Sequence, residues 1–413
     1  MSHGIAAIGA AGDLLLEAAE VPACVLDIAE RFGPLASMHA ALDAAGIGTP
    51  CGTVAFFEGR SLSELNSAVS VARRRFPVLQ TRLAWRRGRP VLEPHPVGLP
   101  GGLWEHQLIP AADGVWLHAC WRHAAADGRS MLRFLQAVAA VLGTERFCMP
   151  ELKRRPAAQP QPMAPWLGRF LSERARSYVR LEDVDPSASC GVTWLMSSPA
   201  DRDRLLDAAG EGLGVVGPLA AAAAASFCEQ QIGSRGGLVS LNVPVARDDL
   251  DDLGGFGFGV GSLILPVRVR GGDDSAELGL SISQQIRQLA AEGFDRNLDR
   301  FLGRSPLRHR VFGAIRARSR PDPAVVVSWK GRQEIGGADG IRRLACFAGS
   351  PTLHVSAHAD RNGFSISVAS RQSAGARAEL LESMAQRLGI RSFRSIDLSE
   401  LAPDPLLGCA SRA

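Results

Sequence analysis

The sequence predicts an α/β protein, in the mixed α+β sense, built as two lobes. Strand-like and helix-like segments alternate along the whole chain, which favours sheets flanked by helices. With 413 residues the chain is too long for one ordinary core. The segment 155–165, RPAAQPQPMAP, is rich in proline, which fixes φ and removes backbone donors, so we expect a connector there. The predicted lobes are residues 1–160 and 161–413.

The expected elements of the first lobe follow from local periodicity. A β-branched and aromatic run predicts a strand, apolar residues at helical spacing predict helices, and strict alternation predicts further strands. The predicted strands are 51–58, 78–85 and 114–121, and the predicted helices are 61–74 and 130–142.

The second lobe shows the same mixture. Residues 360–363, Asp-Arg-Asn-Gly, are a hairpin turn signal, because Asn and Gly tolerate positive φ. The predicted helices are 166–180, 219–231, 277–291 and 377–388, and the predicted strands are 192–197, 237–245, 260–269, 324–328, 352–359 and 363–369.

Composition restricts the class of protein. Hydrophobic residues make up 46% and charged residues 21%, as in an ordinary globular protein. No uninterrupted apolar run reaches the ~20 residues of a membrane helix, and the N-terminus has acids at Asp13 and Glu17 in place of a basic signal region. The eight cysteines are scattered and never form C-x-x-C, which favours reduced thiols over disulfides or a zinc site. We therefore expect a cytoplasmic protein with no membrane span and no metal.

The basic charge is almost entirely arginine. The net charge is +4, and Lys153 and Lys330 are the only lysines. Arginine dominance is typical of a GC-rich genome, which is the favoured interpretation, and the alternative is attraction of an anionic donor such as a coenzyme phosphate or an acidic carrier protein. No basic segment interleaved with aromatic residues is present, so we expect no nucleic-acid partner.

The most informative motif is Trp121-Arg-His-Ala-Ala-Ala-Asp-Gly128. It lies where a predicted strand ends and a predicted helix begins, so His123 is expected to project from a loop into a cleft. A simpler interpretation is also open, because Asp127 is a good N-cap residue, Gly128 is a common turn residue, and His123 could be an ordinary loop histidine.

The motif H-x-x-x-D-G resembles the signature of the chloramphenicol-acetyltransferase-like superfamily, which includes condensation domains, carnitine and plant BAHD acyltransferases, and polyketide-associated acyltransferases. Four further segments resemble conserved stretches of condensation-type members, and together they cover most of the chain in the right order. They are 73–82 (RRRFPVLQTR), 241–247 (LNVPVAR) with 254–266 (GGFGFGVGSLILP), 325–331 (VVVSWKG) and 353–370.

The resemblance implies two similar lobes of mixed sheets flanked by helices, with the active site in a tunnel between them. It implies that His123 is the catalytic base, that Asp127 is structural and pairs with Arg247, and that Gly128 keeps the cleft open. Ser328 is a candidate donor to an oxyanion, although the family usually has Asn where this chain has Trp329. Independently of the resemblance, a neutral imidazole can take a proton from an attacking acceptor and return it to a departing thiolate.

The predicted function is acyl transfer from a thioester to a hydroxyl or amine of a small-molecule acceptor, with no bound cofactor. The co-substrate would be acyl-CoA or the phosphopantetheine thioester of an acyl-carrier protein. One alternative is a free-standing condensation-type domain that forms an amide, although Arg122 replaces the second histidine of many condensation domains. The other is a catalytically silent scaffold relative.

Other signals carry less weight. The glycine run 254–261 precedes a predicted strand and lacks the G-x-G-x-x-G spacing, so a dinucleotide site is not expected. His354 and His358 are four residues apart along a strand, about 13 Å, which is too far to share a metal. We expect them to have no chemical role and His118 to support the core beneath His123.

Overall fold

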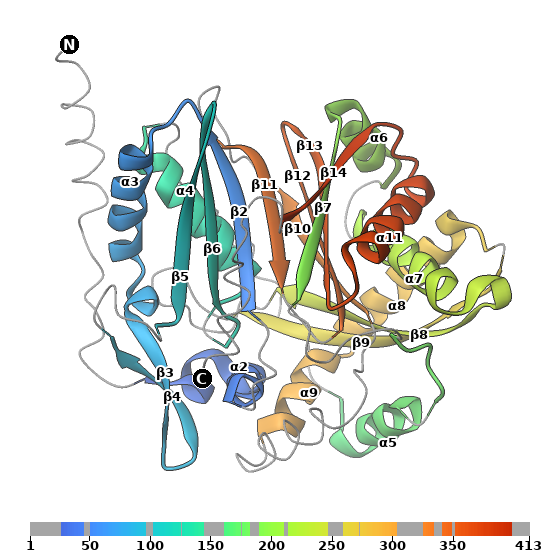
Figure 1. Cartoon of the computed structure of the whole chain (residues 1–413). Helices are drawn as coiled ribbons and strands as arrows, with labels where there is room; N and C mark the ends of the chain where they lie inside the picture. The colour runs from blue at the N-terminus through green and yellow to red at the C-terminus, as the bar shows by residue number, and fades with distance from the viewer. Residues whose placement is uncertain are drawn as a thin grey trace.

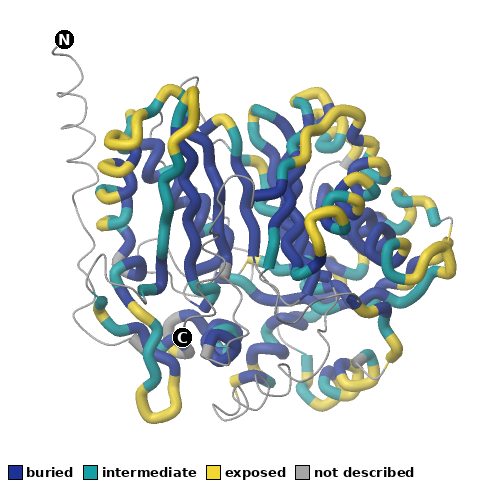
Figure 2. The backbone as a smooth tube through the Cα atoms, in the orientation of Figure 1, coloured by how far each residue is buried: buried dark blue, intermediate teal, exposed yellow. Residues whose placement is uncertain are grey.

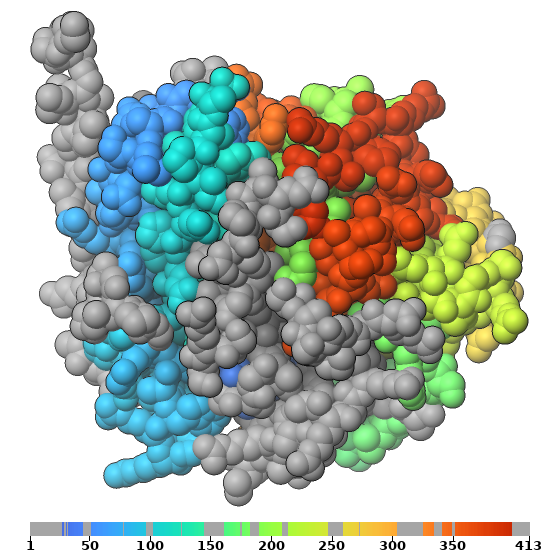
Figure 3. All heavy atoms as spheres, in the orientation of Figure 1, coloured from blue at the N-terminus to red at the C-terminus, as the bar shows by residue number. Residues whose placement is uncertain are grey.

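The computed structural model describes most of the chain between residues 26 and 398. The described residues are 26–44, 50–95, 102–124, 126–143, 161–174, 176–181, 190–209, 214–246, 259–271, 273–303, 325–333, 341–348 and 352–398. They form two main sheets, a smaller one of four strands and a larger one of seven, that stand side by side, each with helices on its outer face (Figure 1). A third, separate sheet has three strands in the order β1 (Leu26–Asp27), β4 (Arg89–Pro94) and β3 (Thr81–Arg86). In the space-filling view, the early part of the chain gathers on one side and the late part on the other (Figure 3). The mixed α/β class expected from the sequence is confirmed.

The smaller sheet has four strands in the order β11-β2-β6-β5 and is antiparallel throughout. Helices α3 and α4 lie against it (Figure 1). The α3 helix begins at a capping box in which Ser61 and Glu64 bond each other's backbone N–H groups. The bounds are β2 Pro50–Glu58, β5 Trp104–Ala111, β6 Gly114–Arg122, β11 Ile341–Ala348, α3 Leu62–Arg75 and α4 Gly128–Val141.

The larger sheet has seven strands in the order β14-β7-β13-β12-β10-β8-β9. The strand β10 runs parallel to both β12 and β8, whereas the other neighbours are antiparallel. The bounds are β7 Gly191–Ser197, β8 Gly237–Ala246, β9 Val260–Val269, β10 Val325–Arg332, β12 Leu353–Asp360, β13 Gly363–Ser370 and β14 Phe393–Asp397. Its helices are α6 Pro199–Ala209, α7 Val216–Ile232, α8 Ser275–Ala291 and α11 Ala374–Arg387.

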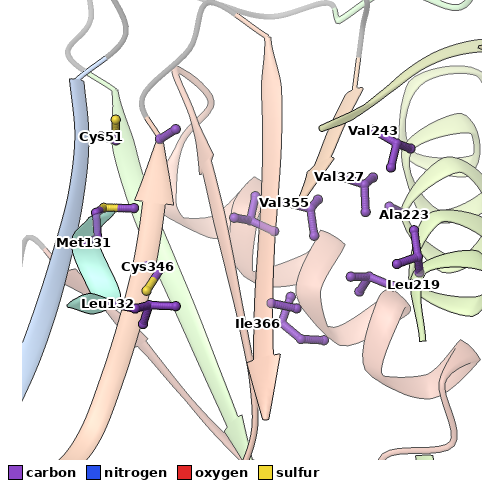
Figure 4. Close-up of a cluster of buried hydrophobic side chains, with 14 of the residues drawn as sticks. Cys51, Met131, Leu132, Leu219, Ala223, Val243, Val327, Cys346, Val355 and Ile366 are labelled. Carbon is purple, nitrogen blue, oxygen red and sulfur yellow. The ribbon is translucent and has the colours of Figure 1, made fainter. Parts of the chain in front are cut away.

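The two faces of the larger sheet differ because apolar and polar side chains alternate along its central strands. Val327, Val355 and Ile366 lie on the face that packs against α7 through Leu219 and Ala223 (Figure 4). The alanine-rich sequence of α7 allows this close approach, and its alanines between 220 and 224 are fully buried. The residues in between, such as Ser328 and Ser356, point to the opposite face, toward the smaller sheet.

One strand crosses between the two halves of the sequence. The strand β11 belongs to the second half, yet it pairs with β2 along its whole length. From the larger sheet, Ser365 donates to the carbonyl of Leu344 (3.0 Å) and Ser367 donates to the carbonyl of Cys346, so β11 joins both sheets. The proposed boundary at residue 160 lies beside residues outside the described part and stays a prediction, but the smaller sheet is not made by the first half alone.

A buried apolar cluster also joins the sheets. Trp116 of the smaller sheet meets Trp194 of the larger sheet edge-on, with ring centroids 6.4 Å apart, and Phe56 and Phe347 belong to the same cluster. The tube view shows that the strands are mostly buried, whereas outward-facing turns of α3 and α11 are exposed (Figure 2).

Several elements were not predicted from the sequence. The helix α2 contains Gly33 at φ 82° followed by Pro34, so it consists of two short helices that meet at a kink and lacks a continuous period. Residues 77–80 form a 3₁₀ turn beginning at Pro77, so the strand expected at 78–85 starts three residues later. The remaining elements are β1 Leu26–Asp27, α2 Ile28–Ala44, η1 Pro77–Gln80, β3 Thr81–Arg86, β4 Arg89–Pro94, α5 Met163–Arg174, η2 Gly233–Arg235 and α9 Phe294–Gly303.

Every helix among the described residues is too short or too polar to cross a membrane.

Candidate active site

His123 lies where the sequence placed it, between the end of β6 at Arg122 and the start of α4 at Gly128. The loop is short and tightly packed, with Ala124 and Ala126 buried. The imidazole Nδ1 lies 2.9 Å from the carbonyl oxygen of Ala126. A carbonyl can only accept, so Nδ1 carries the proton and Nε2 presents a lone pair. This tautomer is the one a general base needs.

The surroundings of His123 keep the ring neutral. Burial lowers the pKa of His123, the hydrogen bond to Ala126 opposes that effect, and the positive charge of Lys330 lowers the pKa further. The imidazole therefore stays neutral to lower pH than an ordinary histidine does. The ring of His39, from α2, packs at 4.5 Å from the ring of His123.

Asp127 caps α4 and ties it to the larger sheet. Its Oδ1 accepts from the backbone N–H groups of Arg129 (2.9 Å) and Ser130 (3.0 Å), as the simple helix-start interpretation requires. Its Oδ2 accepts from the backbone N–H of Gly259 at 3.0 Å, and the Arg129 guanidinium donates to the carbonyl of the same Gly259 at 2.8 Å. Although burial acts to raise the pKa of Asp127, Arg129 and these N–H donors hold it below its usual value.

We name the two hydrogen bonds that join Asp127 and Arg129 to the backbone N–H and C=O of Gly259 the Gly259 clamp. It connects the first turn of α4 to the residue that precedes β9. The predicted partner of Asp127, Arg247, lies outside the described residues, as does most of the glycine segment that begins at Gly254, so the Asp127–Arg247 pair stays a prediction. Among the described residues, Asp127 joins the two sheets through Gly259.

Gly128 leaves room for a lysine. A Cβ atom at position 128 would collide with Nζ and Cε of Lys330, which comes from β10 on the other sheet. The resemblance implied that this glycine keeps a cleft open, and in this chain the space beside it is occupied by the Lys330 side chain. Lys330 is one of only two lysines in the chain.

Ser328 and Lys330 share one face of β10. The ammonium of Lys330 donates to Oγ of Ser328 at 2.7 Å, and Ser328 is buried. Trp329 faces the other way and stacks on Phe364 at 5.6 Å, among the apolar residues under the helices. The replacement of the family's usual Asn by Trp329 is therefore a change on the far face of the strand.

Two further titratable residues to which the sequence assigned no role are Asp43, beside Arg122, and His354, beside Lys330 and His123. Asp43 lies on α2 one turn after His39, and burial raises its pKa to about 7, while Arg122 acts to lower it. His354 lies on β12, and burial, Lys330 and His123 together hold its pKa well below the usual value. The expectation that His354 has no chemical role stays a prediction, and His354 lies within electrostatic reach of the candidate base.

The face of the larger sheet that looks toward the smaller sheet is polar. Asn242 and His354 align with Val326 in the strand register, and Ser356 aligns with Ser328. Buried atoms of three of these side chains, Asn242 Oδ1, His354 Nδ1 and Ser356 Oγ, have no hydrogen-bond partner among the described residues. Buried polar atoms are normally satisfied, so this face is suited to a polar ligand or water.

Comparisons with known proteins show the fold. No family model and no curated protein sequence matches the chain. Solved structures do match, among them trichothecene 15-O-acetyltransferase from Fusarium sporotrichioides, with a TM-score of 0.63 and 12% identity over 88% of this chain and 95% of that one. The epimerization domain from the third module of tyrocidine synthetase B has a TM-score of 0.60 and 14% identity, covering 90% of this chain and 97% of that one. The starter condensation domain of rhizomide synthetase, solved with C8-CoA and Leu-SNAC, has a TM-score of 0.56 and 13% identity, covering 87% of this chain and 94% of that one.

The chain has the chloramphenicol-acetyltransferase-like fold. The similarity covers nearly the whole length of each neighbour, so both lobes take part. The tunnel that this fold implies would be bounded in part by residues outside the described ranges, and it stays a prediction.

This fold does not by itself fix the reaction, because the neighbours include an acetyltransferase, an epimerization domain and a condensation domain. The choice must therefore come from the site. Among the described residues no three histidine, cysteine or carboxylate side chains are arranged to hold a metal ion. The groups that the candidate site does present are a histidine of fixed tautomer, a serine hydroxyl and a lysine.

Sequence reasoning named His123, Asp127, Gly128 and Ser328 as candidate site residues but did not name Lys330, which the structure places beside Gly128 and Ser328. A signal was available, because a lysine is rare in this chain and Lys330 stands two residues after Ser328. His39 and Asp43 had no such signal, since the kinked helix that carries them shows no clear period.

Proposed function

We propose that this protein is an acyltransferase that moves an acyl group from a thioester to a hydroxyl or amine, with His123 as general base. The observation that carries the proposal is the hydrogen bond from His123 Nδ1 to the Ala126 carbonyl, which leaves Nε2 unprotonated. The lowered pKa of His123 supports the same role, because the base is already deprotonated near neutral pH.

The proposed reaction balances without a covalent enzyme intermediate. Nε2 of His123 takes the proton of the acceptor O–H or N–H as its oxygen or nitrogen attacks the thioester carbonyl carbon. The carbonyl π pair moves to oxygen, and Ser328 donates a hydrogen bond to the resulting oxyanion. The oxyanion then collapses, the C–S bond breaks, and the imidazolium returns the proton to the departing thiolate.

We further propose acyl-CoA as the donor, with an acyl-carrier protein as the alternative. The named acetyltransferase and the C8-CoA complex among the structural neighbours support a CoA thioester. The free cysteines of the described chain, four of which are buried, are compatible with the cytoplasmic location where such thioesters occur.

The test is thioester consumption measured as release of free thiol. We expect the wild type to consume acetyl-CoA or octanoyl-CoA in the presence of a panel of small alcohols and amines. His123→Ala should lower the rate by about 10²–10⁴-fold while the denaturant melt stays unchanged. His95→Ala, a histidine just past β4, is the matched control.

The outcomes separate the alternatives. A fully active, folded His123→Ala protein would show that the mechanism is wrong. No thiol release from either CoA donor, together with release from the same acyl group on a carrier protein, would favour the condensation-type alternative. No release from any donor would favour the scaffold alternative.

A further inference from the structure

Lys330 is a lysine in an unusual position, partly buried between the two sheets. Its ammonium donates to Ser328 Oγ at 2.7 Å. Among the described residues no ion pair joins it to a carboxylate. The charge of Asp127 acts on it from beyond ion-pair distance, and the oxygens of Asp127 accept hydrogen bonds from the backbone of α4 and from Gly259. A cation that is costly to bury and lacks a carboxylate partner is expected to serve an electron-rich group.

The direction of the Lys330–Ser328 bond constrains the serine. An ammonium has only donors, so Ser328 Oγ is the acceptor, and the serine's own proton must point elsewhere. A hydroxyl that accepts a charge-assisted hydrogen bond is polarised and becomes a better donor. The lysine therefore both orients the Ser328 O–H and strengthens it.

The position of the pair places it beside the candidate base. The Lys330 side chain lies against Gly128, the first residue of α4, in the same turn region that carries His123. The larger sheet supplies Ser328 and Lys330, and the smaller sheet supplies His123, so base and hydroxyl come from opposite sides of the site. A carbonyl between them would have its carbon toward the acceptor and His123 and its oxygen toward Ser328.

We propose that Lys330 is a positioning residue for acyl transfer, which holds and polarises Ser328 so that its hydroxyl stabilises the oxyanion. This inference rests on the proposed acyltransferase function. As the bond from the acceptor to the carbonyl carbon forms, the π pair moves to oxygen and Ser328 donates a hydrogen bond to it. Ser328 and Lys330 both keep their protons, and the C–S bond breaks when the carbonyl re-forms.

A matched pair of ketones tests the proposal. Both are octanoyl-pantetheine analogues, one with CF₂ and one with CH₂ in place of the thioester sulfur. The CF₂ ketone forms a tetrahedral hydrate that ionises readily, whereas the CH₂ ketone stays a neutral carbonyl. Preference for the CF₂ ketone, as a ratio of Kd values, thus measures stabilisation of the oxyanion and not of the ground-state substrate.

We expect Lys330→Met, which keeps the length of the side chain beside Gly128, to lower this ratio by about 10²-fold, the typical loss of an oxyanion donor. Ser328→Ala should lower it similarly, and the double variant should lose little more, because the two residues act as one unit. The control is Arg332→Met, which removes an exposed cation from the same strand. It should leave the ratio unchanged.

Two outcomes would overturn the inference. A Lys330→Met protein with the wild-type ratio would show that the ammonium does not act on the oxyanion. Equal weakening of both ketones would show that Lys330 binds an anionic part of the ground-state substrate. Failure of the proposed function is a separate result, because it would appear as thioester consumption that does not depend on His123.

Discussion

His123 owes its chemistry to two neighbours that act in opposite directions on its charge. The Ala126 carbonyl fixes the proton on Nδ1, and Lys330 disfavours a second proton on Nε2. The first interaction is local and comes from a loop of three alanines. The second crosses from the other sheet, so the basicity of the histidine depends on how the two sheets are docked.

The pH dependence of activity follows from this arrangement. Because burial and Lys330 lower the pKa of His123, activity should fall on the acid side with an apparent pKa below 6.5. Lys330→Met removes a positive charge, so the pKa of His123 should rise and the acid limb should move to higher pH. The measurement is the pH profile of thiol release from acyl-CoA.

The same shift can be observed without substrate. In protein labelled with ¹⁵N-histidine, the His123 signal, assigned with His123→Gln, should titrate at higher pH in Lys330→Met than in the wild type. Arg332→Met is again the control. An unchanged His123 titration in Lys330→Met would contradict the electrostatic coupling between the two residues.

At the scale of elements, the Gly259 clamp joins α4 to β9. The carboxylate of the N-cap residue Asp127 accepts from the N–H of Gly259, and the guanidinium of Arg129, in the first helical turn, donates to the carbonyl of the same residue. Hydrogen bonds to charged groups are worth more than neutral ones, about 1.5–3 kcal/mol each. The clamp therefore fixes the loop of His123 against the larger sheet more firmly than a helix cap alone.

Two substitutions separate the cap from the clamp. Asp127→Asn retains an oxygen at the N-cap position but loses the negative charge toward Gly259 and Arg129, whereas Asp127→Ala loses both. We expect Asp127→Ala to cost about 3 kcal/mol in unfolding free energy and Asp127→Asn to cost clearly less, since loss of a cap alone costs about 1 kcal/mol.

Denaturant melts of the two variants and of Arg129→Met provide the measurement. In the double variant Asp127→Ala with Arg129→Met, the loss of unfolding free energy should be smaller than the sum of the two single losses, because both side chains bond the backbone of the same residue, Gly259. Additive losses, or a cost of only about 1 kcal/mol for Asp127→Ala, would leave Asp127 as a helix cap and nothing more.

On the scale of the whole molecule, the fold interlocks its two halves. The strand β11 completes the smaller sheet, and Ser365 and Ser367 bond it to the larger one. Trp116 and Trp194 pack across the same junction. The candidate site draws His123 from one side and Ser328 with Lys330 from the other, so its geometry exists only when both halves are docked.

The two halves of the chain, produced as separate fragments, should therefore lack activity. A fragment of residues 1–155 lacks β11, so the edge of β2 is unpaired and the Trp116 cluster is exposed. We expect this fragment to aggregate or to give a broad, non-cooperative melt, and neither it nor the fragment 166–413 should release thiol. Co-expression of the two fragments is the control, since docking of the two halves should restore activity. Turnover by the fragment 1–155 alone would refute a site shared between the halves.

Much of this protein could be predicted from the sequence, because the signals are local. The predicted strands 352–359 and 363–369, together with the Asp-Arg-Asn-Gly turn signal between them, predicted the β12–β13 hairpin, which is confirmed. The motif from His123 to Gly128 was correctly placed between a strand and a helix, and Asp127 was recognised as a cap residue. These features depend on neighbours in the chain, where propensity and spacing act.

The tertiary structure alone decided the rest. The strand β11 pairs with β2 although the two are far apart in the sequence, with 292 residues separating Thr53 from its partner Ala345. This pairing follows from docking of the sheets, so no local sequence pattern predicts it. Lys330 meets Gly128, and His39 meets His123, because non-local packing brings separate strands and helices together. The sequence by itself determined the class of fold and singled out His123 as the candidate base, while the tautomer of that histidine, its electrostatic partner and the hydroxyl opposite it depend on distances that only the folded chain defines.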